Sequence, residues 1–362
     1  MRILHCADMQ LGYRQYGFQQ REIDFYTAAV ETLHRAIDLE VDAVIIAGDI
    51  FEMPRPPGAA VRILQDAVSE LVKHGIQVLG VDGNHDAVDG NWMAVAGIQG
   101  LHHSIVEIKG IRIAGLNGLR PATFKSELQR LLDNPSAGRI DVLTIHQSIA
   151  EMADFVAQEI SAIELAPMLH AAGVRYVAMG DIHDYKELDV GGVRFAYSGS
   201  TEINAADERE DKSFSIIDIT EDDLKIEMHP IRVRQFIQTY LETDADLDQL
   251  LTQIQAANEP MAFVWYDPAV PDLKRRAEAV LDGRVPMYKV LPRKSKDTIK
   301  LVEKLRRDGV ERKGALLNLK DSVEVYFEPE TDEYQLVFQL LETPNSVPEV
   351  VQQYLKSKGL EI

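Results

Sequence analysis

Short runs of almost entirely apolar residues alternate with helical patterns along the first 220 residues of this 362-residue chain. Such runs are typical of strands that are buried on both faces, as in sheets covered by helices. The sequence therefore predicts an α/β domain. The expected strands span residues 2–7, 42–47, 76–81, 105–108, 111–116, 141–145, 174–179, 187–190, 193–197 and 213–219, and the expected helices residues 22–39, 58–74, 123–132 and 161–171.

The pattern changes at about residue 222. Strands expected at 224–228, 231–241, 261–266 and 285–290, with helices at 244–256 and 271–281, predict a small α+β unit of a size that can hold its own core. A basic helix, a hairpin and a capped terminal helix are expected after Pro292. We therefore expect a first domain of residues 1–221, a capping domain of residues 222–290 and a C-terminal extension of residues 291–362.

The charge balance is strongly acidic. Lys and Arg total 38 against 58 Asp and Glu, which gives a net charge of −20, and such a surface repels nucleic acid on average. Residues 289–313 oppose this balance with ten basic and four acidic residues, a local charge of +6. A charge run is usually a solvated helix face, and it indicates a contact for phosphates or an acidic partner only if the rest of the chain points to nucleic acid.

The sequence predicts a protein without a membrane span. No window approaches 18 consecutive apolar residues, and the apolar run at the N-terminus is broken before it could serve as a signal peptide. Cys6 is the single cysteine, so no internal disulfide can form, and a reducing, cytoplasmic location fits.

Five of the predicted strands lead into carboxylate, amide or imidazole side chains. The segments are Asp8-Met9-Gln10, Gly48-Asp49, Gly83-Asn84-His85-Asp86, His146-Gln147 and Gly180-Asp181-Ile182-His183. Ligand sites in open α/β sheets lie beyond the carboxyl ends of the strands, so we expect these side chains along one edge. Each segment alone is more often a turn or a surface histidine. The probability that all five segments occur in this order by chance is small, on the order of one in twenty.

Mixed oxygen and imidazole donors predict a two-metal centre. They suit Mn, Fe or Zn, and a chain with one cysteine cannot build a sulfur-rich zinc site. One carboxylate can bridge two divalent cations, and each cation then needs several further oxygen or nitrogen ligands. Paired cations activate a water molecule and neutralise charge on a phosphate, so this set favours phosphoester hydrolysis. A histidine that is not a ligand could assist departure of the leaving oxygen.

These segments resemble the five motifs of the calcineurin-like metallophosphoesterases. Within that family the chain is most similar to the SbcD-type DNA-repair exonucleases, which include archaeal and eukaryotic meiotic-recombination nucleases, through residues 11–16, 48–51 and 197–202. The resemblance covers about residues 1–220 and rests on layout alone in the small domain. It implies a metallophosphoesterase sandwich of two mixed sheets flanked by helices, a capping domain over residues 222–290 that contacts DNA, and a nuclease that acts on DNA ends in double-strand-break repair.

The resemblance also implies roles for the matched residues. Asp49 would bridge the two metals. Asp8 and His183 would bind the first metal, and Asn84 and His146 the second.

Four further positions complete the implied site. His85 would be the catalytic imidazole at the phosphate, and Asp86 would orient its ring. Gln10 and Asp181 stand where the family has histidine, one on each metal. Their oxygens still bind hard cations, so both are kept as metal ligands, and the shift towards oxygen donors favours Mn²⁺, with Mg²⁺ as the alternative, over Zn²⁺.

The resemblance implies partners as well as a reaction. We expect a homodimer built through the phosphoesterase domain, working with an SbcC-like ATPase of the SMC type that supplies part of the DNA affinity and binds residues 291–362. No phosphate-loop motif occurs, so no ATPase activity is expected in this chain itself. Two alternatives are kept open: a DNA-end-binding scaffold whose altered site no longer cuts, and a phosphodiesterase for small phosphoesters.

Overall fold

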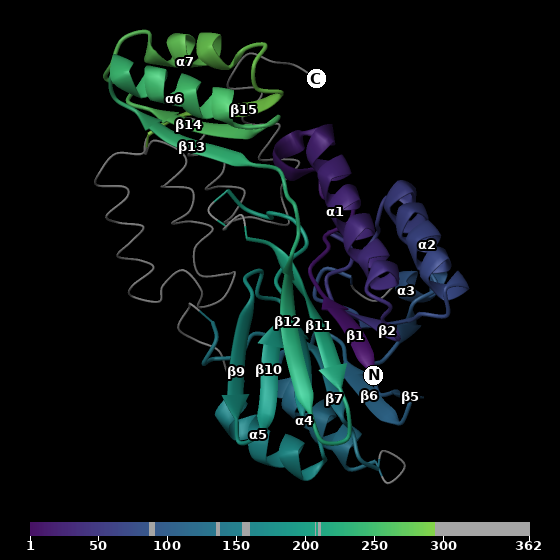
Figure 1. The fold of residues 1–362 in the computed structure, drawn as a ribbon. Helices are drawn as coiled ribbons and strands as arrows, with labels where there is room; N and C mark the ends of the chain where they lie inside the picture. Colours follow the sequence, from purple (N-terminus) through teal and green to yellow (C-terminus); the bar gives the residue numbers. More distant parts are fainter. Residues whose placement is uncertain (87–90, 135–137, 154–159, 207, 209–210, 294–362) are drawn as a thin grey trace, which may run out of the picture. The chain divides into compact units, whose positions relative to one another are not determined.

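The computed structural model describes residues 1–86, 91–134, 138–153, 160–206, 208 and 211–293 (Figure 1). Residues Met1–Arg293 form one compact unit. The basic helix, hairpin and terminal helix predicted after Pro292 lie outside the described residues. Among the residues described, no helix combines the length and the apolar character that crossing a membrane requires.

The first of two large sheets has six strands in the order β12-β11-β1-β2-β3-β4. They are β1 (Arg2–Cys6), β2 (Ala43–Ala47), β3 (Gln77–Val81), β4 (Gln99–Gly100), β11 (Ser213–Ile219) and β12 (Leu224–Pro230). Strands β1 to β4 are parallel, β11 pairs antiparallel with β1, and β12 antiparallel with β11. Helices α1 (Gln19–Asp38), α2 (Gly58–Lys73) and α3 (Trp92–Val95) pack against one face of this sheet.

The second large sheet also has six strands, in the order β5-β6-β7-β8-β10-β9. They are β5 (Ile105–Ile108), β6 (Ile111–Leu116), β7 (Val142–His146), β8 (Tyr176–Gly180), β9 (Lys186–Val190) and β10 (Val193–Tyr197). The four middle strands are parallel, and β5 and β9 add antiparallel edges. Helices α4 (Pro121–Leu132) and α5 (Ala162–Ala171) share a core with one face of this sheet.

Strand β2 shows why the central strands are apolar at every position. All its residues are buried. Val44 and Ile46 share a core with α1 and α2, whereas Ala43 and Ile45 share a core with the second sheet. A strand between a helix layer and a sheet needs apolar residues on both of its faces. The predicted sandwich of two mixed sheets flanked by helices is therefore confirmed.

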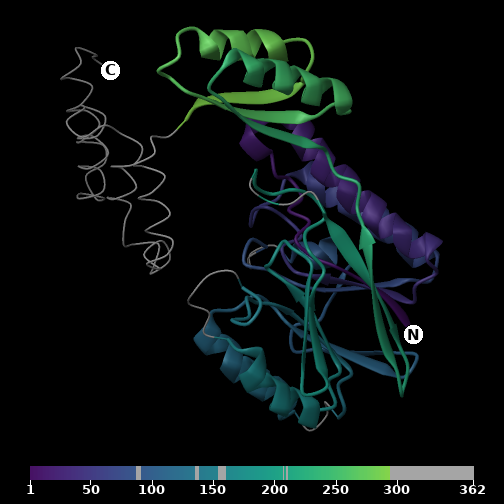
Figure 2. The same cartoon turned by 60° about the vertical axis from the view of Figure 1, so that its left-hand side comes forward.

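A third sheet contains three parallel strands in the order β13-β14-β15. Its elements are β13 (Phe236–Leu241), α6 (Asp244–Ala256), β14 (Met261–Tyr266), α7 (Leu273–Leu281) and β15 (Met287–Pro292). Both helices cover the same face of this sheet (Figure 2), where Leu250, Val264 and Leu281 share a buried core. We refer to residues 236–293 as the cap unit.

Two segments differ from their sequence-based prediction. Residues 224–230, expected in the small unit, form β12 and pair with β11 in the first large sheet. The strand expected over residues 231–241 begins only at Phe236. The alternating burial along β12 fits an edge strand of any sheet, so its pattern does not specify which sheet it joins.

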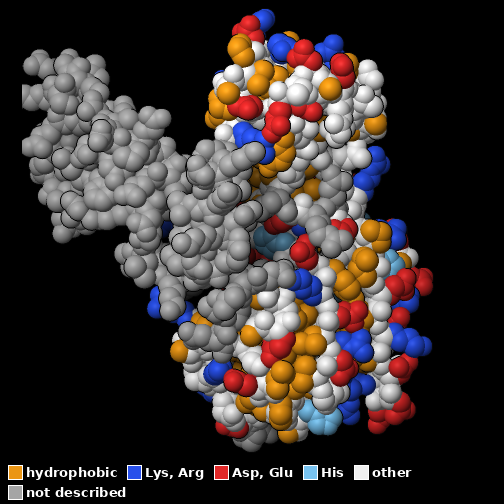
Figure 3. Space-filling view, turned by 90° about the vertical axis from the view of Figure 1, so that its left-hand side faces the viewer, with side chains coloured by type: hydrophobic (Ala, Val, Ile, Leu, Met, Phe, Trp, Pro, Cys, Tyr) orange, Lys and Arg blue, Asp and Glu red, His pale blue; other side chains and the backbone are white. Residues whose placement is uncertain are grey.

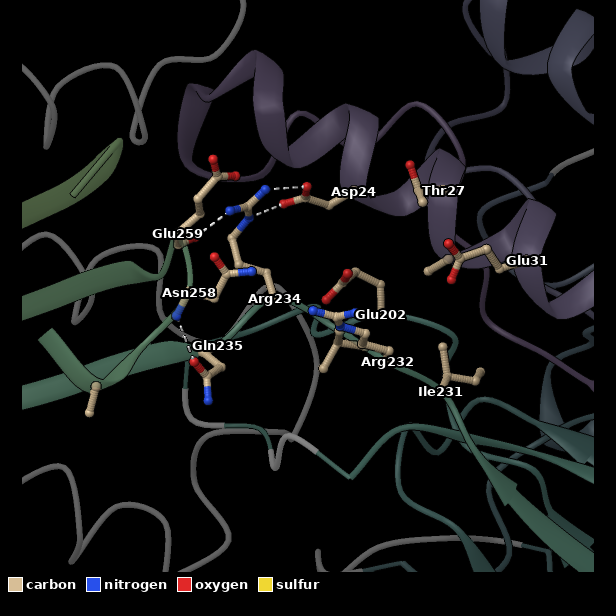
Figure 4. Close-up of a pocket in the computed structure, with 13 residues that line it drawn as sticks. Asp24, Thr27, Glu31, Glu202, Ile231, Arg232, Arg234, Gln235, Asn258 and Glu259 are labelled. Atoms are coloured by element: carbon tan, nitrogen blue, oxygen red, sulfur yellow. Dashed lines mark hydrogen bonds and ion pairs between the residues drawn. The ribbon is translucent and has the colours of Figure 1, made fainter. Parts of the chain in front are cut away.

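Residues 231–235 connect the first sheet to the cap unit and border a cavity of about 630 Å³ (Figure 4). Arg234 donates hydrogen bonds to both carboxylate oxygens of Asp24 on α1, at 2.6 and 2.7 Å. Asp24 also accepts a hydrogen bond of 2.8 Å from Arg21, a fully buried residue that bonds to Glu202. This network ties the connecting segment to α1, and the cavity beside it contains none of the predicted site residues.

Candidate metal centre

The loops after β1 and β2 run side by side at the carboxyl ends of their strands. The Asp8 N–H donates to the Gly48 carbonyl and the Gln10 N–H donates to the Asp49 carbonyl, both at 3.0 Å. Asp8, Gln10, Asp49 and Asp181 have positive φ angles of 54°, 46°, 48° and 97°. A left-handed backbone costs about 1–2 kcal/mol at a residue with a side chain. Four such residues in one cluster mark a functional site, where backbone strain commonly concentrates.

Two glycines allow these loops to approach each other closely. A Cβ atom on Gly83 would collide with the carboxylate of Asp49, and one on Gly48 would collide with the ring of His146. The glycines that precede the polar residues in these segments are therefore required by the packing of the site itself.

Asp8, Asp49 and His146 form the centre of the cluster. All three are buried, and they offer ligand atoms that lie within 4.8 Å of one another. The Nδ1 atom of His146 donates to the Ala47 carbonyl at 2.9 Å. This bond directs Nε2 into the cluster, where it lies 2.9 Å from Oδ1 of Asn84 and 3.8 Å from Oδ1 of Asp181. Ligands of one metal ion are about 3 Å apart when each metal–ligand bond is about 2.1 Å, so His146 and Asn84 fit a shared cation.

The carboxylate of Asp49 lies between the two halves of the site. Its Oδ1 accepts the backbone N–H of His85 at 3.0 Å. Its Oδ2 accepts the side-chain N–H of Gln10 at 3.1 Å and lies 3.5 Å from Nε2 of His146. The other amide atom of Gln10, Oε1, is buried without a hydrogen-bond partner among the described residues. A buried, unpaired acceptor beside the Asp49 carboxylate fits a metal ligand.

Burial and charge perturb all three central groups. Burial raises the pKa of Asp8 to about 7, against the opposing charges of His146 and His183. Burial also disfavours the carboxylate of Asp49, but its interaction with His146 prevails and lowers the pKa of Asp49 to about 2. The same contact, together with Asp8, overcomes burial and raises the pKa of His146 to about 10. The buried carboxylates thus favour a proton on Nε2 of His146, and a bound cation would replace that proton.

His183 is held by a carboxylate that the sequence analysis did not identify. Its Nδ1 lies 2.6 Å from Oε1 of Glu208, and Oε2 of Glu208 accepts a hydrogen bond of 2.7 Å from the buried Lys212. Burial opposes ionisation of Glu208, but His183 and Lys212 outweigh it and lower the pKa of Glu208 to about 2. A carboxylate on one ring nitrogen fixes the orientation of an imidazole and leaves the other nitrogen for a ligand.

His85 and Asp86 follow each other in sequence but have separate contacts. Nδ1 of His85 donates to the Glu52 carbonyl at 2.9 Å, and Nε2 lies 3.9 Å from Oδ2 of Asp49. The carboxylate of Asp86 accepts three backbone N–H groups, from Ile50, Phe51 and Gly83. The expectation that Asp86 orients the His85 ring is therefore corrected: Asp86 joins the loops after β2 and β3, and the Glu52 carbonyl holds the ring.

The predicted residues surround two adjoining cavities. A cavity of about 240 Å³ is lined by Gln10, Asp49, Asn84, His85, Asp181 and His183, together with Tyr13, Glu52 and Asn204. A larger one of about 1040 Å³ shares Asn84 and Asp181 and adds His146 and Asp86. Figure 3 shows a histidine and acidic side chains together in a hollow of the surface. Eight of the nine predicted residues line these cavities, and the ninth, Asp8, is fully buried beneath them.

The fold and this site define the class of protein. The chain belongs to the family described as calcineurin-like phosphoesterase, whose pattern matches residues 1–185. This match confirms the resemblance, and members of the family use a site of two divalent metal ions, for which Asp8, Asp49 and His146 are candidate ligands here.

The chain is similar to several curated archaeal proteins named DNA double-strand break repair protein Mre11. The chain is 30% identical to the protein of Methanosarcina mazei, over 68% of this chain and 40% of that protein. It is 28% identical to that of Methanosarcina acetivorans, over 78% and 47%, and 24% identical to that of Sulfolobus acidocaldarius, over 99% and 91%. The matches thus span less than half the length of the two Methanosarcina proteins.

Proposed function

We propose that this protein is a metal-dependent nuclease that acts on DNA ends in double-strand-break repair. The observation that carries the proposal is the cavity of about 240 Å³, where amide, carboxylate and imidazole side chains from five separate loops converge beside His85. The names of the archaeal relatives support DNA as the substrate.

The positions of the donor atoms support two ion sites. We assign Asp49 as the bridging ligand because it contacts Gln10 on one side and His146 on the other. One ion would be held by Asp8, Gln10 and His183, and the other by Asn84, His146 and Asp181. Two divalent ions supply a water of lowered pKa and neutralise charge on the phosphate.

His85 is assigned to the leaving group. The Glu52 carbonyl occupies Nδ1, so Nε2 is the ring nitrogen that remains for contact with the substrate. The side chain is 39% exposed and lines the smaller cavity, so Nε2 can reach a bound phosphodiester. From there it can donate its proton to the departing oxygen.

The donor set favours Mn²⁺, with Mg²⁺ as the alternative. Five of the seven proposed ligands offer oxygen, and only His146 and His183 offer nitrogen. Such a set suits hard cations that still accept imidazole.

Two other functions remain to be separated from this one. The replacements at Gln10 and Asp181 favour a scaffold that binds DNA ends without cutting them. A phosphodiesterase for small phosphoesters is less favoured, because the site opens into the larger cavity of about 1040 Å³.

Incubation of the purified protein with labelled duplex and single-stranded DNA and Mn²⁺ tests the proposal. Metal bound without any cleavage identifies the scaffold, and strong competition by mononucleotide esters identifies the small-substrate enzyme.

Restoring histidine at positions 10 and 181 tests the assigned ligands. Histidine tolerates the left-handed backbone found there better than most residues do. We expect Gln10→His with Asp181→His to raise metal affinity, because imidazole binds late first-row metals more tightly than an amide oxygen does. If the native site is active, the cleavage rate of the double variant should stay within about tenfold of the rate of the unmodified protein. If the native site is inactive, cleavage should be detected only with the double variant.

Each single variant should strengthen only one of the two ion sites. Bound-metal stoichiometry and DNA cleavage, titrated with Mn²⁺, provide the measurement. A double variant that neither binds more metal nor cuts better would remove positions 10 and 181 from the ligand set.

We further propose a homodimer and an SbcC-like SMC-type ATPase partner bound through the C-terminal extension. Removal of residues 294–362 should leave bound metal unchanged and abolish co-purification with the ATPase. The cut after Arg293 preserves β15, whose residues pair with β14 along the cap sheet. The full chain with the same tag is the control. Recovery of the ATPase at full yield with the truncated protein would place the contact elsewhere.

A further inference from the structure

One face of the cap sheet carries four aromatic side chains, one lysine and no acidic residue along its strands. Its nine outward positions are Phe236, Gln238, Tyr240, Met261, Phe263, Trp265, Met287, Lys289 and Leu291. Side chains alternate along a strand, and the intervening residues pack beneath α6 and α7. In a chain with a net charge of −20, an outward face without Asp or Glu is a local exception.

The two ends of this face differ in exposure. Met261, Phe263 and Met287 are buried and pack with Tyr16 and Phe18. At the carboxyl ends of the strands the face is open, with Tyr240 55% exposed and Leu291 40% exposed.

The aromatic rings form a row that leads to the open end. Phe236 and Phe263 stack at 5.9 Å with an interplanar angle of 14°. Trp265 then stacks on Phe263 at 6.0 Å and on Tyr240 at 5.1 Å, each with an angle of 22°. The row ends in two partly exposed rings, Trp265 and Tyr240, that are nearly parallel.

Two cations flank the row. The guanidinium of Arg293 lies 5.4 Å from the centre of the Tyr240 ring and also pairs with Glu242. The ammonium of Lys289 lies 5.0 Å from the centre of the Phe18 ring. Flat rings beside cations match the two parts of an unpaired nucleotide: a base that stacks and a phosphate that carries charge. Glu242, which follows β13, pairs with Arg293 and is the carboxylate that a phosphate would displace there.

A short segment connects this row to the metal centre. Tyr16 packs edge-on against Phe263 at 4.7 Å, and its hydroxyl accepts the backbone N–H of Ala206. Three residues earlier, Tyr13 lines the smaller cavity of the metal centre. A strand of substrate that leaves the metals therefore has aromatic neighbours along residues 13–16.

We propose that the open end of this face binds an unpaired stretch of DNA, with bases stacked on Tyr240 and Trp265 and phosphates held by Lys289 and Arg293. The proposal rests on the proposed function and specifies which form of the substrate meets the cap unit. Bases in a duplex are already stacked on each other, so these rings should select single strands. The cations favour a nucleic acid over an apolar protein partner.

Trp265 provides the signal for a direct test. The chain has two tryptophans, so Trp92→Phe leaves Trp265 as the single reporter. We would add Asp49→Ala and a chelator to prevent cleavage, and titrate with oligothymidylate or a blunt duplex of equal length. The single strand should quench Trp265 fluorescence, with an affinity that falls as salt rises, and the duplex should not.

Variants then separate stacking from charge, using the anisotropy of a labelled oligonucleotide. Tyr240→Ala should weaken binding by between about fivefold and about a hundredfold, and Trp265→Phe should retain most of the affinity because it keeps a ring. Lys289→Ala should lower the salt slope by about 0.7, which corresponds to one phosphate contact. Lys274→Ala, on α7 behind the sheet, is the matched charge control and should change neither quantity.

Three outcomes would overturn the proposal: equal quenching by duplex and single strand, unchanged affinity in Tyr240→Ala, or a Trp265 already shielded from acrylamide because protein covers the face. Because binding is measured without metal or cleavage, the test is independent of nuclease activity. If the protein binds DNA through Tyr240 but never cuts it, the proposed nuclease function is refuted and this inference stands. If the protein cuts DNA without such binding, this inference is refuted and the proposed function stands.

Discussion

An Asp49→Ala variant is expected to lose metal-dependent DNA cleavage altogether. The carboxylate accepts hydrogen bonds from Gln10 and from the His85 backbone and faces His146, so its removal affects both proposed ion sites at once. Bound Mn²⁺, measured by elemental analysis, should fall together with cleavage of labelled DNA.

The fold should survive this substitution, because the strands on either side of the loop are held by the core. Asp42→Asn is the matched control, since Asp42 is a carboxylate at the opposite end of the same strand, paired with Lys109. The control should bind metal and cut as the parent does. Cleavage by Asp49→Ala near the parent rate in Mn²⁺ would refute the two-metal assignment.

Replacement of His85 should give the opposite combination, with metal retained and cleavage lost. The ring is held by the Glu52 carbonyl, and its Nε2 lies 3.9 Å from the nearest Asp49 oxygen, so none of the proposed ligands depends on it. Loss of a general acid typically lowers a rate by about 10²–10⁴. Single-turnover cleavage and bound-metal stoichiometry of His85→Ala provide the two measurements.

His74→Ala serves as the histidine control, because His74 is exposed and lies at the end of α2. It should match the parent in both measurements. If His85→Ala instead lost a metal ion, His85 would be a ligand and the leaving group would need another proton donor.

The sequence predicted which residues lie together at the candidate site, because strand patterns and polar residues coincide there. Asp49 follows a strand that is buried at every position, and Asn84 follows one that is buried at all but its first position, so the sheet alone brings them to one edge. The polar segments could be recognised together because each one interrupts an apolar run.

Contacts between distant loops could not be predicted in the same way. Glu208 and Lys212 lie in a polar stretch ahead of β11, and no periodicity there indicates that they hold His183. The predicted role of Asp86 is wrong because residues adjacent in sequence need not be in contact. In a tight loop, adjacent side chains point in different directions, and the Asp86 carboxylate meets three backbone N–H groups instead.

The bonds that orient the proposed ligands are supplied by protein alone. His146 is fixed by the Ala47 carbonyl, His183 by Glu208, and the loops around Asp49 by Asp86. We therefore expect these protein contacts to keep the proposed ligands in position when an ion departs. If the proposed ions bind there, we expect them to exchange without unfolding of the chain, so that the bound metal follows the supply in the surroundings.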